Sequence, residues 1–153
     1  AVFSHQRKIR FGRLMDLVSV MTPLGLGLGR LGNFIGQELW GRPTDLPWGM
    51  IFPRDPLGLA RHPSQLYQFI LEGCLLLAIL FLFSRKQRPE WAISGLFLSC
   101  YGFFRFYVEF FREPDLHIGF VLYGWMTRGQ LLCIPMILLG GWLLFWAYRI
   151  KDR

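Results

Sequence analysis

The chain has 153 residues, of which 53% are hydrophobic and 17% aromatic, and its mean hydropathy is +0.35. Soluble domains contain about 45–50% apolar residues with glycine included, whereas here 17 glycines come in addition to the hydrophobic residues. This composition excludes an ordinary soluble domain. Residues 1–153 are predicted to form a single membrane domain. The net charge of +7 is compatible with nucleic-acid binding or with the excess of Lys and Arg on the cytoplasmic side of membrane proteins.

The first predicted membrane span covers about residues 14–36 and is rich in glycine. Its segment Gly27–Gly32 matches the dinucleotide-binding pattern G-x-G-x-x-G, but that motif requires a preceding strand, which the sequence does not predict. Glycines four residues apart are instead typical of close packing between membrane helices, or they leave room for a lipid headgroup. Such pairs are Gly25 with Gly29 and Gly32 with Gly36.

The same span carries a polar stripe near its end. Arg30, Asn33 and Gln37 follow one another at steps of three and four, which places them on one helix face, with Glu38 beside them. One interpretation is a helix end whose side chains reach the membrane interface. We favour a second, a phosphate site, because a guanidinium can bond two phosphate oxygens at once.

A loop of about residues 37–63 follows and is predicted on the outer face of the membrane. Its five prolines exclude a continuous helix. Loops of this length are usually functional or disordered, and the large apolar residues Trp40, Trp48 and Phe52 favour a folded loop that is partly inserted. His62 lies near its end, where a single histidine is most often only solvated.

Three further spans are predicted over about residues 64–84, 90–112 and 127–149, each close to the ~20 residues that cross a bilayer. A second outer loop precedes the last span, for which Thr127 is the expected N-cap. Basic residues gather before the first span, between the second and third, and after the fourth. Four spans place these segments on one side, so both termini are predicted to be cytoplasmic and the nucleic-acid interpretation is rejected.

The three cysteines lack a C-x-x-C spacing, so neither a metal site nor a disulfide framework is predicted. They are expected to be buried thiols that pack as small apolar groups. They are Cys74, Cys100 and Cys133.

Four charged residues inside the predicted spans would together cost on the order of 10 kcal/mol if unpaired, which equals a typical total stability of ~5–15 kcal/mol. They are Arg30, Glu72, Arg105 and Glu109. They must therefore pair with each other or face a polar cavity. Glu72 is expected to be the counter-ion of a buried arginine.

Four residues of the third span recur at steps of four, four and three, which predicts one helix face. They are Tyr101, Arg105, Glu109 and Arg112. The pair of Arg105 with Glu109 either fixes helix packing alone or holds the guanidinium towards an anion; we favour the second.

Four segments, taken in order, resemble the prolipoprotein diacylglyceryl transferase family. They are GRLGNFIGQELWG at residues 29–41, RHPSQLY at 61–67, YGFFR at 101–105 and VEFFR at 108–112. The resemblance covers nearly the whole chain and implies an all-α enzyme of the bacterial inner membrane with seven helices, of which this chain would hold the last four.

The resemblance also implies the reaction and the partners. The diacylglyceryl group of phosphatidylglycerol would pass to the lipobox cysteine of a prolipoprotein signal peptide, releasing glycerol phosphate, at a site towards the outer leaflet of a monomeric enzyme. No cofactor and no metal are implied. Tyr101, Arg105 and Glu109 are assigned to catalysis. Substrate binding is assigned to Arg30, Asn33, Glu38, Gly41, His62 and Arg112.

Two departures from the family pattern are expected to matter. Gly36 stands where the signature usually has a second asparagine, which removes one headgroup hydrogen bond. The family's upstream His-Gly-Gly segment is absent from this sequence, so the general base is expected outside it and the chain is expected to be inactive alone. The alternatives are a small transporter or channel for an anionic solute, and a purely structural membrane subunit.

Overall fold

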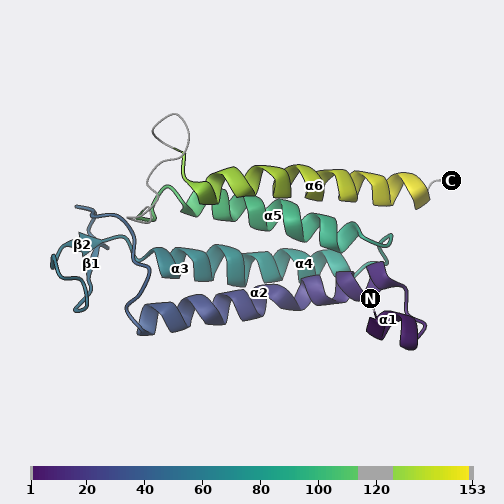
Figure 1. The fold of residues 1–153 in the computed structure, drawn as a ribbon, viewed down its shortest axis with the longest axis horizontal. Helices are drawn as coiled ribbons and strands as arrows, with labels where there is room; N and C mark the ends of the chain where they lie inside the picture. Colours follow the sequence, from purple (N-terminus) through teal and green to yellow (C-terminus); the bar gives the residue numbers. More distant parts are fainter. Residues whose placement is uncertain (1, 114–125, 152–153) are drawn as a thin grey trace.

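The computed structural model describes residues 2–113 and 126–151, and in it long helices lie side by side with a small hairpin at one end (Figure 1). The second outer loop predicted before Thr127 falls mostly on residues 114–125, outside the described residues. The helices are α1 (Val2–Gln6), α2 (Phe11–Ile35), α3 (Ser64–Gln68), the π-helix η1 (Phe69–Leu75), α4 (Leu76–Ser84), α5 (Ala92–Val108) and α6 (Arg128–Lys151).

Three helical segments are long and apolar enough to cross a membrane, which supports a helical membrane protein. They are Phe11–Ile35, the continuous run Ser64–Ser84, and Arg128–Ile150. The fourth predicted span corresponds to α5, which has 17 residues. At 1.5 Å per residue it is about 26 Å long, slightly less than the ~30 Å hydrocarbon core, so the fourth span stays a prediction.

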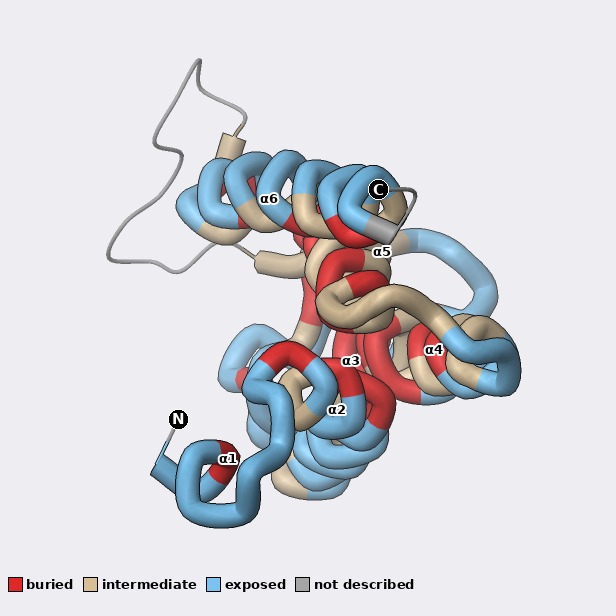
Figure 2. The backbone as a smooth tube through the Cα atoms, turned by 90° about the vertical axis from the view of Figure 1, so that its right-hand side faces the viewer, coloured by how far each residue is buried: buried red, intermediate tan, exposed pale blue. Residues whose placement is uncertain are grey.

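The buried residues face the interior of the bundle and the outer faces of the helices are mostly exposed (Figure 2). Many of the exposed residues are large and apolar. On α6, for example, Leu132, Leu138 and Phe145 are 67%, 68% and 62% exposed. Leucine and phenylalanine on an outer surface fit a lipid environment, because there the apolar solvent removes the cost of exposing them. Cys74 is also exposed, so the prediction that all three thiols are buried was wrong for this residue.

The helices α2 and η1 cross at Gly27 and Gly73. A Cβ atom on Gly73 would lie 2.9 Å from the Cα of Gly27, so the two backbones touch. The predicted close packing at the other glycines is not seen within the described chain: Gly25, Gly29 and Gly32 have open space around them, and a Cβ on Gly36 would meet first its own helix. This open space is compatible with the second interpretation, room for a lipid headgroup. A regular spacing of glycines indicates that a helix can be approached closely, but it does not indicate which face of the helix meets the neighbouring helix.

The helices α5 and α6 pack equally closely. A Cβ on Gly140 would lie 2.5 Å from the backbone nitrogen of Ser99, and one on Gly95 would lie 2.7 Å from that of Leu144. At the start of α5, the buried carboxylate of Asp16 accepts hydrogen bonds from the backbone N–H groups of Trp91 and Ser94. The first turn of α5 is thus capped from α2.

The loop after α2 folds against the end of α5. Its strands β1 (Met50–Ile51) and β2 (Ala60–Arg61) form an antiparallel pair, and isolated bridges join Pro43 to Arg61 and Gly41 to Arg112. The predicted folded loop therefore exists, although its strands were not foreseen. The bridge also corrects the prediction for Arg112, which lies beyond the helix end at Val108 and not on its face.

Candidate functional site

A polar centre lies between α2, η1 and α5, at the end of the bundle that carries the hairpin. The Nε atom of Arg30 lies 3.8 Å from an oxygen of Glu72. Arg105 also lies near this carboxylate, and Tyr101 lies near Arg30, Glu72 and Arg105. The folded chain thus brings Arg30, Tyr101 and Arg105 near Glu72, which pairs with an arginine as expected; their roles in binding and catalysis stay predictions.

The π-helix η1 positions Glu72. Its side chain is fully buried, and within the described residues neither carboxylate oxygen has a hydrogen-bond partner. The Nε2 of Gln68 is buried and unpartnered in the same way. A buried carboxylate without hydrogen bonds is costly, and π-turns inside helices are frequent at functional sites. A polar group that paired with Glu72 and Gln68 would remove this cost.

A second cluster surrounds Glu109 at the end of α5. Its carboxylate lies 3.0 Å from Arg105 Nη2 and 4.0 Å from Arg112 Nη1. The hydroxyl of Thr127 donates a hydrogen bond of 3.0 Å to its other oxygen. Both arginine side chains are mostly buried, and Arg105 Nη1 has no hydrogen-bond acceptor within the described chain. Glu109 therefore holds one edge of the Arg105 guanidinium while the other edge remains available.

Thr127 caps α6 as predicted. The backbone N–H of Thr127 donates to the side chain of Gln130, and the backbone N–H of Gln130 donates to the Thr127 hydroxyl. This reciprocal arrangement is a capping box, and the T-x-x-Q spacing in the sequence could have revealed it. Because the same hydroxyl also bonds Glu109, the start of α6 is fixed to the charged cluster.

The end of α2 turns sharply beside Arg30. Gln37 takes a left-handed conformation (φ 57°), and the backbone N–H groups of Gln37 and Glu38 donate to Phe34 and Asn33. This is a Schellman ending, normally made by glycine. Asn33 is half-buried, whereas the Glu38 side chain is exposed, and among the residues described no ion pair joins Glu38 to an arginine. The stripe predicted from spacing is therefore split by the turn.

Gly41 and His62 lie beside the polar centre rather than in it. Gly41 is buried where a Cβ would come within 2.5 Å of the Phe111 carbonyl oxygen and 2.6 Å of that of His62, so close backbone approach requires glycine. His62 borders an apolar cavity of about 350 Å³ and lies 3.1 Å from the Tyr67 hydroxyl. Burial lowers the pKa of His62, which favours the neutral ring at pH 7.

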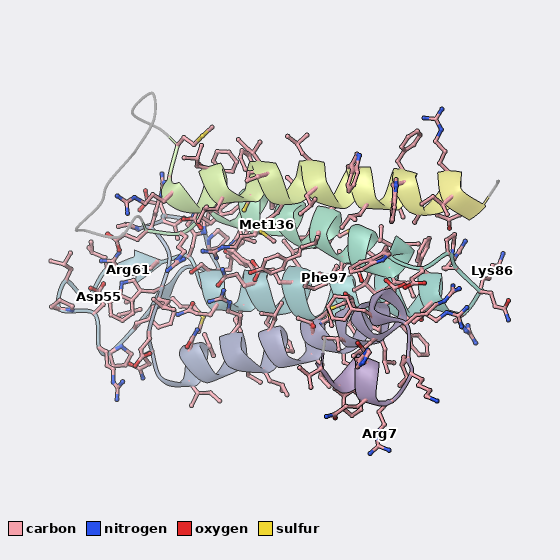
Figure 3. All side chains as sticks on the ribbon, turned by 45° about the vertical axis from the view of Figure 1, so that its right-hand side comes forward. Arg7, Asp55, Arg61, Lys86, Phe97 and Met136 are labelled. Carbon is pink, nitrogen blue, oxygen red and sulfur yellow. The ribbon has the colours of Figure 1, made fainter. Side chains whose placement is uncertain are left out.

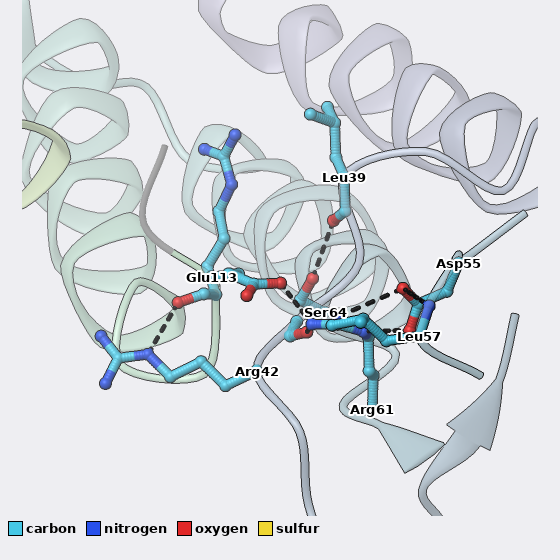
Figure 4. A network of polar contacts seen from close by, with 9 residues as sticks. Leu39, Arg42, Asp55, Leu57, Arg61, Ser64 and Glu113 are labelled. Carbon is cyan, nitrogen blue, oxygen red and sulfur yellow. Dashed lines mark hydrogen bonds and ion pairs between the residues drawn. The ribbon is translucent and has the colours of Figure 1, made fainter. Parts of the chain in front are cut away.

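A buried arginine that sequence reasoning did not assign holds the hairpin in place (Figure 4). The guanidinium of Arg61 bonds both oxygens of Asp55 at 2.6 and 3.3 Å, and it also pairs with Glu113. The pairing raises the pKa of Arg61 and lowers the pKa of Asp55. No local spacing signals a contact of this kind, because Asp55 lies across the hairpin and Glu113 lies beyond α5.

The arrangement can bind an anion in a place shielded from water. Arg30 and Arg105 flank one buried carboxylate, Arg112 lies near the second, and tyrosine and amide groups are adjacent. Within residues 2–113 and 126–151, His, Cys, Asp and Glu side chains do not form a group of three that could hold a metal ion. These side chains supply hydrogen bonds and guanidinium groups that stabilise negative charge.

Comparison with known proteins adds independent information. The family model described as prolipoprotein diacylglyceryl transferase matches residues 1–146. A phosphatidylglycerol–prolipoprotein diacylglyceryl transferase of Azotobacter vinelandii is 57% identical over 152 residues, which are 99% of this chain and 57% of the relative. The protein of that name from Teredinibacter turnerae is 61% identical over 148 residues, covering 97% of this chain and 51% of the relative. The chain thus spans about half the length of these curated relatives.

Proposed function

The chain belongs to the prolipoprotein diacylglyceryl transferase family, and on that basis we propose that the complete protein transfers the diacylglyceryl group of phosphatidylglycerol to the lipobox cysteine of a prolipoprotein. Glycerol phosphate is the second product. The relatives carry this reaction in their names. The alternatives drawn from the sequence, an anion transporter and a structural subunit, gain no support from these comparisons.

The observation that carries the proposal is the available edge of Arg105. Glu109 fixes one Nη atom at 3.0 Å, and the other is buried without a hydrogen-bond acceptor within the described chain. An unpaired buried N–H group costs about 1–3 kcal/mol. A lipid phosphate placed there would satisfy it with a charge-assisted hydrogen bond, which is among the stronger contacts in proteins.

The chemistry follows from that placement. The substrate thiol must lose its proton, since a free thiol has a pKa of ~8.5, and the general base lies outside this chain. The thiolate attacks the glycerol carbon that is bonded to phosphate. A sulfur–carbon bond forms and the carbon–oxygen bond breaks with its electron pair on the phosphate. Arg105 and Arg30 stabilise the charge that grows on this leaving group, an effect strongest where water is excluded.

We assign catalysis to Arg105, with Glu109 orienting its guanidinium and Tyr101 beside it. The substrate-binding set is Arg30, Asn33, Glu38, Gly41, His62 and Arg112. Within this set the arginines and Asn33 meet the headgroup, whereas Gly41 and His62 form the wall around it. Glu38 lies at the exposed mouth, where it is placed to meet the glycerol hydroxyl groups or the incoming peptide.

The proposed topology has four spans in one membrane domain, residues 1–153, as the last four of seven. The protein is placed in the bacterial inner membrane as a monomer, with both ends of this chain cytoplasmic and the loop of about residues 37–63 on the outer face. Two arguments support this orientation. Basic residues concentrate at the end that carries the start of α2, and the polar centre lies at the opposite end, next to the hairpin.

The test is transfer of labelled diacylglyceryl from phosphatidylglycerol to a lipobox peptide by the complete protein. Arg105→Lys keeps the charge but removes the planar fork, so we expect at least a ~100-fold loss of kcat, as for the loss of one donor at a charge-stabilising site. Arg128→Lys, an exposed arginine at the start of α6, is the matched control and keeps full activity. Unchanged transfer by Arg105→Lys would remove the phosphate role; anion flux without transfer would favour the transporter.

A further inference from the structure

A cationic cavity lies at the opposite end of the bundle from the polar centre. It has a volume of about 510 Å³ and lies between the start of α2, the link between α4 and α5, and the end of α6. In Figure 3 the labelled Arg7 and Lys86 mark this end of the bundle, and the labelled Arg61 and Asp55 mark the end with the hairpin. Arg13 and Arg30 are 17 residues apart on α2, which corresponds to about 26 Å along the helix, so the cavity is separate from the proposed transferase site.

Three arginines and one carboxylate set the charge of this cavity. They are Arg10, Arg13, Arg88 and Glu90. Glu90 is already engaged, because the backbone N–H of Gly12 donates to it at 3.1 Å and Arg10 lies 3.4 Å from it. The remaining positive charge belongs to Arg13 and Arg88, so the cavity has an excess of positive charge for an anion.

Arg88 is held in place for such a contact. Its Nε donates to the Phe83 carbonyl oxygen at 2.9 Å, one Nη donates to the Tyr148 hydroxyl at 3.2 Å, and the guanidinium lies 4.0 Å from the centre of the Phe83 ring. A guanidinium has five N–H donors, and these contacts use only part of them. Arg13 is exposed and makes no ion pair or hydrogen bond within the described residues.

The far wall of the cavity is apolar and belongs to α6. It is formed by Trp146, Ala147 and Ile150, while Trp91 lies at the cavity on the side of α5. Trp146 and Ile150 are 40% and 53% exposed. Tryptophan is enriched where a membrane protein meets the headgroup region. A cationic rim next to such a wall matches a molecule with one anionic group and long apolar chains.

We propose that this cavity binds an anionic phospholipid, with its phosphate between Arg13 and Arg88 and its acyl chains along Trp146 and Ile150. Within the described residues α2 and α6 do not pack against each other. A lipid in this position therefore contacts two helices that do not touch each other in the described part of the chain, and its binding stabilises the bundle by linkage. The inference does not depend on the proposed transferase reaction.

The experiment measures binding of phosphatidylglycerol to the complete protein, delipidated in a neutral detergent, by native mass spectrometry and by the shift in thermal unfolding. Arg13→Gln combined with Arg88→Gln removes both cationic groups. Because the variant loses the charge-assisted hydrogen bonds to the phosphate, we expect it to lose one bound lipid, with at least ~10-fold weaker binding. Arg7→Gln with Arg85→Gln, exposed at the same end, is the control and keeps it.

Arg13→Gln alone breaks no ion pair or hydrogen bond of the described residues, so it separates a loss of lipid binding from a folding defect. We expect it to lower the affinity for the lipid in part. Transfer activity is measured in parallel, because phosphatidylglycerol also binds at the proposed catalytic site, where these variants are expected to have no effect. Equal losses in the control pair would mean diffuse attraction and would overturn the proposal. It would also be overturned by unchanged lipid binding in both Arg13 variants, by equal binding of phosphatidylcholine, or by an equal shift with soluble glycerol phosphate.

Discussion

Gly140 and Gly141 are neighbours on α6 that meet opposite surroundings. A Cβ on Gly140 would lie 2.5 Å from the backbone nitrogen of Ser99 and 2.7 Å from the carbonyl oxygen of Gly95. A Cβ on Gly141 would meet nothing within 4 Å in the described chain. Replacing each by alanine adds one methyl group to the same helix, one residue apart, so the pair isolates the effect of helix contact.

The magnitude follows from these distances. Non-bonded heavy atoms prefer about 3.5–4.0 Å, so Gly140→Ala must move α5 and α6 apart by about 1 Å. Overpacking of this kind costs ~1–3 kcal/mol. The higher helix propensity of alanine contributes up to ~1 kcal/mol in both variants and cancels in the difference. We therefore expect Gly141→Ala to be at least as stable as the natural protein and Gly140→Ala to be less stable than Gly141→Ala by ~1–3 kcal/mol.

The assay is unfolding of the complete protein in detergent micelles, followed by circular dichroism. Gly95→Ala serves as an independent repeat, because its Cβ would lie 2.7 Å from the backbone nitrogen of Leu144. Equal stability of Gly140→Ala and Gly141→Ala would refute the close crossing of α5 and α6, and so would a Gly95→Ala variant that unfolds like the natural protein.

Three further outcomes are expected. Thr127→Ala removes a helix cap, worth ~1 kcal/mol, and the hydrogen bond to Glu109. We therefore expect its unfolding midpoint to fall, whereas Thr127→Ser keeps the hydroxyl and unfolds like the natural protein. Arg61 lowers the pKa of Asp55, so the pair stabilises the folded protein above the unfolded pKa of about 4 and this contribution is lost as the pH falls below it. The free energy of unfolding measured over a pH series should therefore fall less in acid for Asp55→Asn than for the natural protein. An equal fall in both would contradict this. Burial lowers the pKa of His62, so the free energy of unfolding declines as the pH falls below about 6.5, the unfolded pKa. We expect His62→Gln to remove this decline, and an unchanged decline in His62→Gln would contradict the prediction.

Some features of the site were readable because they depend on helical spacing alone. Arg105 and Glu109 are four residues apart and form the predicted pair, and Glu72 meets Arg30 as expected because charges inside apolar helices must find partners. The prediction for Arg112 was wrong because the helix ends at Val108, a boundary that apolar composition does not mark. Whether Glu38 and His62 meet substrate stays a prediction.

The sequence by itself determined that this chain lies in a membrane, roughly which segments form its long helices, and that charges within them need partners, because apolar composition and a period of 3.6 residues are local properties. Only the tertiary structure decided that Gly27 rather than Gly25 meets the neighbouring helix, that Arg61 holds the hairpin through Asp55, and that Asp16 caps α5. These contacts join residues distant in the chain, and their energies depend on how the helices are rotated against one another, which no local pattern specifies.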